Sequence, residues 1–134
     1  MKQYPEKVLV AWGEAISGNA EIRDWLMKNN YPELGLFCFA LYFDKGAVEW
    51  LMKHAPHLLA TIKAIEGKKE ALVWLHRNNF PLLVQLAKAA DHDEQEMRRL
   101  VQTDRLFAVI AQKIKFVKDE IEEANNDVHR WGYE

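Results

Sequence analysis

Five histidines and one cysteine are the residues of this 134-residue chain best suited to metal binding or nucleophilic catalysis. His54 and His57 stand three residues apart, but Pro56 lies between them and interrupts the helical face that would bring their rings together. His92 lies in the acidic run 91–94, where carboxylates at a helix start also stabilise the helix dipole. Metal sites usually need three or four convergent ligands, and no CxxC, HExxH or calcium-loop spacing occurs. We therefore expect no metal and no cofactor.

The single cysteine, Cys38, lies in the uncharged apolar segment 34–43. A thiol in such surroundings is expected to be a small buried hydrophobe, because a nucleophilic cysteine needs nearby positive potential to favour its thiolate. The sequence contains no Gly-rich phosphate loop, and no catalytic triad can be assembled from it. We therefore expect a protein without catalytic residues that is not an enzyme. An enzymatic site assembled across distant segments remains an alternative without located residues.

A second candidate for chemistry is a ladder of cations, Lys28, Lys53 and Arg77, each three residues after a tryptophan. In a stack of helices such a basic ladder could line a groove for a nucleic-acid backbone or an acidic peptide. Each cation would also stand in the last turn of its helix, where a positive charge is favoured by about 0.3–1 kcal/mol without any ligand. The net charge of −2 favours this second interpretation. A nucleic-acid-binding solenoid is therefore kept as the alternative function.

The elements that carry these residues recur along the chain. Trp-Leu pairs begin at Trp25, Trp50 and Trp74, so successive copies are 25 and 24 residues apart. All four prolines occupy one position of this repeat: Pro5, Pro32, Pro56 and Pro81. Because proline suits the first turn of a helix and disfavours helix before it, each proline marks a break followed by a helix. Each unit is thus predicted to be a helical hairpin, with Trp50 and Trp74 buried at equivalent positions.

Two further columns support this hairpin repeat. Small residues stand eight positions after each proline, at Gly13, Ala40, Ala64 and Ala89. We expect these residues to be buried where neighbouring helices approach closely. The pairs Asn29–Asn30 and Asn78–Asn79 are each separated from the next proline by one residue and are predicted to end their helices in the left-handed conformation.

The fourth unit departs from the repeat and ends it. Arg99 stands where a tryptophan is expected, and Asp104 is positioned to cap a long apolar-patterned last helix. The predicted fold is an all-α solenoid of about four helical hairpins in a single domain, residues 1–134, with a long C-terminal capping helix. The unit boundaries are 4–30, 31–55, 56–79 and 80–104, followed by the capping helix 105–131. A closed helical bundle built from the same hairpins is the alternative.

Composition sets the class of protein. The chain is 49% hydrophobic and 28% charged, which is ordinary for a soluble globular protein. No segment approaches the roughly 20 apolar residues that a membrane-spanning helix needs. A single cysteine suits a reducing compartment. We expect a cytoplasmic protein without membrane association.

Over residues 4 to 100 the pattern resembles that of a group of uncharacterised bacterial proteins built from short α-helical repeats. The residues that carry the resemblance are Trp25-Leu26/Pro32/Leu34/Ala40, Trp50-Leu51/Pro56/Leu58/Ala64 and Trp74-Leu75/Pro81/Leu83/Ala89. The second set departs from the others, with four residues instead of five between leucine and proline. The segment 80–98 is also similar to leucine-rich repeat variant proteins, whose units are short and all-helical. These resemblances imply a helical-repeat fold and bring no activity, substrate or catalytic residue.

An apolar face distinguishes the first two units from the last two. Seven and eleven residues after the prolines stand Trp12/Ile16, Phe39/Phe43, Lys63/Gly67 and Lys88/His92. Because an exposed apolar patch usually marks an interface, we predict that Trp12, Phe39, Tyr42 and Phe43 bind a protein partner or a second copy of the chain. The alternative is that the last helix, about 39 Å long for ~26 residues, lies back across this face and covers it.

Overall fold

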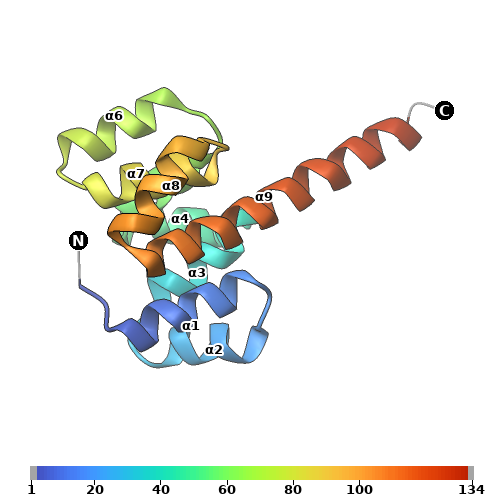
Figure 1. Cartoon of the computed structure of the whole chain (residues 1–134). Coiled ribbons are helices and arrows are strands. Elements are labelled where there is room, and N and C mark those ends of the chain that lie inside the picture. The colour runs from blue at the N-terminus through green and yellow to red at the C-terminus, as the bar shows by residue number, and fades with distance from the viewer. Residues whose placement is uncertain (1–2, 133–134) are drawn as a thin grey trace.

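A computed structural model describes the backbone of residues 3–132 and the side chains of residues 3–125. Within this part of the chain it contains nine α-helices and no strand, which confirms the all-α class (Figure 1). The helices are α1 (Glu6–Ile16), α2 (Ala20–Lys28), α3 (Pro32–Leu41), α4 (Lys45–His54), α5 (Pro56–Ile65), α6 (Lys69–Arg77), α7 (Pro81–Ala90), α8 (Glu94–Thr103) and α9 (Arg105–Gly132).

Helices consecutive in the chain pack on one another, and the odd-numbered helices form the inner layer. Among these, α1 packs on α3, α3 on α5, α5 on α7 and α7 on α9. Because α9 also packs on α1, the contacts among the odd-numbered helices form a closed cycle. The even-numbered helices lie on the outside, and α9 crosses the body before its C-terminal part projects beyond it (Figure 1).

Local sequence signals explain where the helices begin and end. Pro32, Pro56 and Pro81 are the first residues of α3, α5 and α7, whereas Pro5 stands just before α1. Asn30 and Asn79 adopt φ of 75° and 64°, which confirms the predicted left-handed helix ends. The Asp104 side chain accepts a hydrogen bond of 3.2 Å from the backbone N–H of Phe107, which confirms the predicted cap of α9.

The core contains the leucine of each Trp-Leu pair rather than the tryptophan. Leu26, Leu51, Leu75 and their counterpart Leu100 are fully buried, and the predicted column of small residues is buried as well. The expected burial of the tryptophans is wrong for Trp74, which is 37% exposed, and Trp50 is only partly buried. Successive helical residues point about 100° apart. A leucine directed into the core therefore leaves the tryptophan before it on the flank of the helix.

The expectation that Trp12 faces a partner is also wrong, because α9 covers it. The Trp12 side chain is 1% exposed and meets Phe37 of α3 and Phe107 of α9 edge-on, with ring centroids 5.1 and 6.5 Å apart. Helix α9 contributes a buried stripe to this region from Phe107 to Val117. For Trp12, the structure agrees with the alternative, in which the last helix covers the apolar face.

Candidate protein-docking site

The turns that follow α1, α3, α5 and α7 share one backbone conformation. Each contains a left-handed residue just after the helix: Gly18 (φ 105°), Phe43 (φ 66°), Gly67 (φ 92°) and His92 (φ 67°). In the second turn, the N–H of Phe43 donates to Ala40 O at 2.9 Å and that of Asp44 donates to Phe39 O at 3.2 Å. This pairing is typical of a Schellman helix end, which glycine suits best because it has no Cβ. A side chain at this position costs on the order of 1 kcal/mol.

His92, in the fourth turn, makes an intramolecular contact from this strained position. Its Nε2 lies 2.8 Å from Oδ1 of Asp119 in α9. The contact joins the last hairpin to the capping helix, so a side chain at this turn contributes to the closure of the fold.

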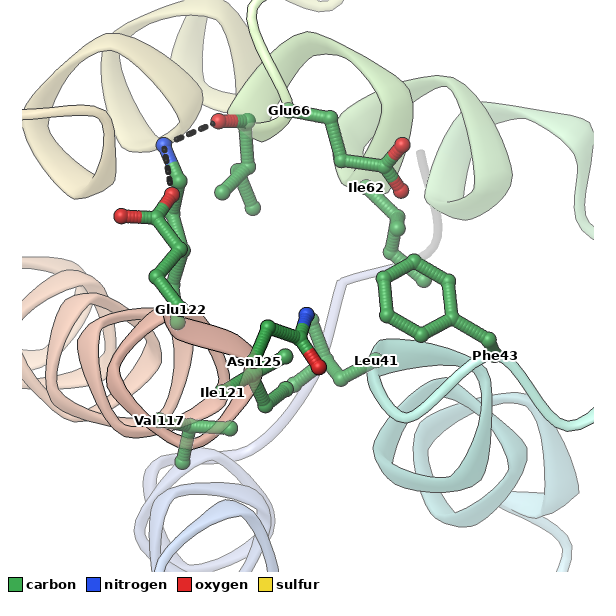
Figure 2. A pocket seen from close by; sticks show the side chains of 10 residues that line it. Leu41, Phe43, Ile62, Glu66, Val117, Ile121, Glu122 and Asn125 are labelled. Atoms are coloured by element: carbon green, nitrogen blue, oxygen red, sulfur yellow. Dashed lines mark hydrogen bonds and ion pairs between the residues drawn. The ribbon is translucent and has the colours of Figure 1, made fainter. Parts of the chain in front are cut away.

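Phe43, in the second turn, lies instead at the mouth of a hollow. The Phe43 side chain is 60% exposed and that of its neighbour Tyr42 is 58% exposed. The hollow has a volume of about 160 Å³ and lies between the C-terminal ends of α3 and α5 and the middle of α9. Its apolar wall consists of Leu41, Phe43, Ile62, Ile65, Val117 and Ile121. In Figure 2, side chains from these helices point into a common space, with the Phe43 ring opposite Glu122.

A second, more open hollow adjoins the first and shares Phe43, Ile121 and Asn125 with it. Tyr42, Glu120 and Ala124 complete its lining. Phe43 therefore borders both depressions of one surface between α3 and α9. We call the two hollows together the docking cleft.

The cation beside the docking cleft, Lys118, already forms contacts within the protein. Lys118 Nζ donates to Ile65 O at 2.7 Å and forms an ion pair with Asp91, and its side chain is 17% exposed. The Lys118 ammonium thus joins α9 to the C-terminal ends of α5 and α7. The acids around the cleft, Glu66, Glu120 and Glu122, are exposed, although Glu122 lies 4.0 Å from the Lys118 ammonium. The rim of the cleft therefore presents negative charge to the solvent.

The structure brings together two of the four predicted partner-binding residues. Tyr42 and Phe43 lie side by side in the docking cleft, whereas Trp12 belongs to the core. Phe39 is half-buried, and the guanidinium carbon of Arg23 from α2 lies 4.3 Å from its ring centroid. Helix α2 therefore covers the Phe39 side chain, and Phe39 does not line the docking cleft.

The predicted basic ladder lies on the outer helices. Lys28, Lys53 and Arg77 are exposed, and each stands in the last turn of its helix, α2, α4 or α6. These helices pack mainly on the odd-numbered helices and not on one another. The placement is the one that favours a cation through the helix dipole, and a role in binding nucleic acid stays a prediction.

The residues first considered for chemistry lie apart from the docking cleft. Burial raises the pKa of the Cys38 thiol to about 12, so the thiol is protonated at neutral pH. Burial also lowers the pKa of His57, whose ring stacks on Phe80 with centroids 5.1 Å apart. Within the described residues, no three His, Cys, Asp or Glu side chains are grouped to hold a metal ion. The described helices include none that is both long and apolar enough to cross a membrane.

Sequence reasoning missed the walls that α5 and α9 contribute to the docking cleft. Ile62 and Ile65 lie in the predicted helix of the third unit without a signal that sets them apart, and the sequence of α9 has no counterpart in the repeats. A usable signal was present at the turn, because the position that holds Phe43 in the second unit holds Gly67 in the third. A large side chain at a position that suits glycine indicates a role beyond the turn itself.

Comparison of the chain with protein-family models, with curated proteins and with solved structures finds no match. The resemblance to helical-repeat families therefore stays a prediction from the sequence pattern.

Proposed function

We propose that the protein is a non-enzymatic interaction module, a short helical-repeat solenoid closed by α9, that binds a segment of another protein chain in the docking cleft. The observation that carries the proposal is Phe43. Its backbone is left-handed, its side chain is 60% exposed, and the equivalent position of the next unit is Gly67. A residue that strains its turn and leaves an aromatic ring in water is best explained by a contact outside the fold.

The dimensions and chemistry of the docking cleft suit such a contact. An apolar cavity of about 150 Å³ can hold a benzene-sized group, so the hollow of about 160 Å³ has room for one apolar side chain. Burial of the parts of Phe43 and Tyr42 that are still exposed would contribute roughly 1–2 kcal/mol each on binding. Interfaces commonly derive most of their affinity from a few central aromatic residues of this kind.

The arrangement of helices supports the repeat part of the proposal. Consecutive hairpins meet through their proline-started helices in chain order, α1 to α3 to α5 to α7. Stacked hairpins of a solenoid make contacts in this order. Helix α9 then meets both α7 and α1 and closes the stack into a ring.

The experiment is a comparison of tagged wild-type protein with Phe43→Gly, each isolated from the cells that produce the protein naturally. We expect one stoichiometric protein to accompany the wild type and to be lost with Phe43→Gly. The control is Phe116→Ala, because Phe116 is 65% exposed on α9 but does not line the docking cleft. Equal recovery with Phe43→Gly and wild type, or no companion with either, would contradict the proposed function.

A further inference from the structure

The charges around the docking cleft restrict the chemistry of the segment that it binds. Exposed carboxylates of Glu66, Glu120 and Glu122 stand at its rim, on the end of α5 and on α9. Among the described residues that line the cleft, Lys118 is the one cation, and its ammonium is already bound to Ile65 O and Asp91. An arriving segment therefore meets an apolar centre with three carboxylates at its rim. Those of Glu66 and Glu120 are in no ion pair among the described residues, and that of Glu122 lies 4.0 Å from the Lys118 ammonium.

We infer that the occupant is a segment of a different protein that presents an apolar side chain flanked by lysines or arginines, as one face of a basic amphipathic helix does. The inference rests on the proposed function and specifies its partner. The apolar side chain fills the hollow beside Phe43, and the flanking cations lie over Glu66 on one side and over Glu120 and Glu122 on the other. Complementary charge of this kind accelerates association and selects among partners more than it adds affinity.

The same charges argue against a second copy of the chain as the occupant. Three carboxylates, those of Glu66, Glu120 and Glu122, line the docking cleft of each copy. A symmetric dimer places the same patch of both copies at one interface, so two docking clefts facing each other would bring these carboxylates together. Like charges placed in this way oppose association.

The test uses two fluorescent synthetic peptides, an amphipathic helix of leucine and lysine and the matched helix with glutamate in place of lysine. Fluorescence anisotropy measures their binding to the full chain. We expect the wild type to bind the lysine peptide and not the glutamate peptide. The double variant Glu66→Lys with Glu122→Lys is expected to weaken binding by at least about tenfold, and moderate salt is expected to weaken wild-type binding.

A matched control separates the docking cleft from net charge. Glu21→Lys with Glu49→Lys changes the charge of the chain by the same amount at exposed positions of α2 and α4, and is expected to leave binding nearly unchanged. Circular dichroism of each variant shows whether the helices are intact.

The outcomes distinguish failure of this inference from failure of the proposed function. If Phe43→Gly abolishes peptide binding while the Glu66/Glu122 reversal does not weaken it, the cleft binds protein but the basic partner is wrong. The inference is also overturned if the control pair loses as much peptide binding as the Glu66/Glu122 reversal, or if the wild type does not bind the lysine peptide. In either case, the isolation experiment with Phe43→Gly still decides the proposed function. Concentration-dependent self-association that Phe43→Gly removes would show that the occupant is a second copy.

Discussion

The turn after α3 and the turn after α7 have the same left-handed backbone and different surroundings. In the later turn, His92 lies 2.8 Å from Asp119 of α9, so its side chain helps to close the cycle of contacts among the odd-numbered helices. In the earlier turn, Phe43 borders a hollow and remains 60% exposed. The turn between them in the chain holds Gly67, which has no side chain to place. The same repeat position thus holds a residue that contacts α9 in the last unit. In the second unit it holds a residue that, in our proposal, contacts another protein.

The largest difference in stability is expected between variants of Trp12 and of Tyr42, two aromatic residues that the sequence predicted to share one apolar face. Trp12→Ala removes a buried ring between α1 and α9 and is expected to lower the free energy of unfolding by about 3–5 kcal/mol. Tyr42→Ala changes a mostly exposed side chain and is expected to stay within about 0.5 kcal/mol of wild type. Urea denaturation measures both values. Similar losses for the two variants would show that Tyr42 belongs to the core.

The next largest effect is the contribution of Lys118 to the free energy of unfolding, because Lys118 joins α9 to the ends of α5 and α7. Lys118→Met removes a hydrogen bond to Ile65 O and an ion pair with the partly exposed Asp91, so we expect a loss of about 1–2 kcal/mol. The matched control is Lys113→Met, whose ion pair with the more exposed Glu14 is expected to be worth less than about 1 kcal/mol. Both losses are measured by urea denaturation. A larger loss for Lys113→Met than for Lys118→Met would contradict this account of closure.

A smaller effect tests the strain of the left-handed turns. At Phe43, glycine is expected to give a protein about 1 kcal/mol more stable than alanine, because only glycine adopts φ of 66° without cost. Gly67→Ala is expected to lose a similar amount for the same reason. Thermal melting of the three variants measures the order. If the alanine variant at position 43 proves the more stable one, the turn is not strained in solution.

The smallest effect per residue is expected from the basic ladder. Replacing Lys28, Lys53 and Arg77 together by glutamine removes favourable charges at three helix ends, each worth about 0.3–1 kcal/mol. Binding of the lysine peptide is expected to stay within about twofold of wild type, since these residues do not line the docking cleft. A salt-sensitive affinity for nucleic acid that this triple variant loses would instead support the alternative function.

Local rules account for the parts of the structure that were predicted well. The prolines that start α3, α5 and α7, the asparagines that end α2 and α6, and the aspartate that caps α9 each act on the backbone within a few residues of their own position. The buried small column also follows from the repeat, because equivalent positions meet equivalent neighbours.

Contacts with α9 could not be predicted in this way. Its sequence repeats nothing, so the pattern alone did not show that α9 would cover Trp12 and leave Phe43 at an open hollow. The burial of the leucine rather than the tryptophan in each Trp-Leu pair was not predicted, for a related reason. Both residues are apolar, and only the direction of the inner layer decides which of the two is buried.

The most direct test of the contrast between the two turns is photocrosslinking from each of them in living cells. A benzophenone amino acid replaces Phe43 in one variant and His92 in another, and irradiation is followed by mass analysis of the tagged chain. The account predicts an adduct with a second protein from position 43, and from position 92 an internal link to α9 without added mass. Internal links alone from position 43, or the same protein adduct from both positions, would contradict it.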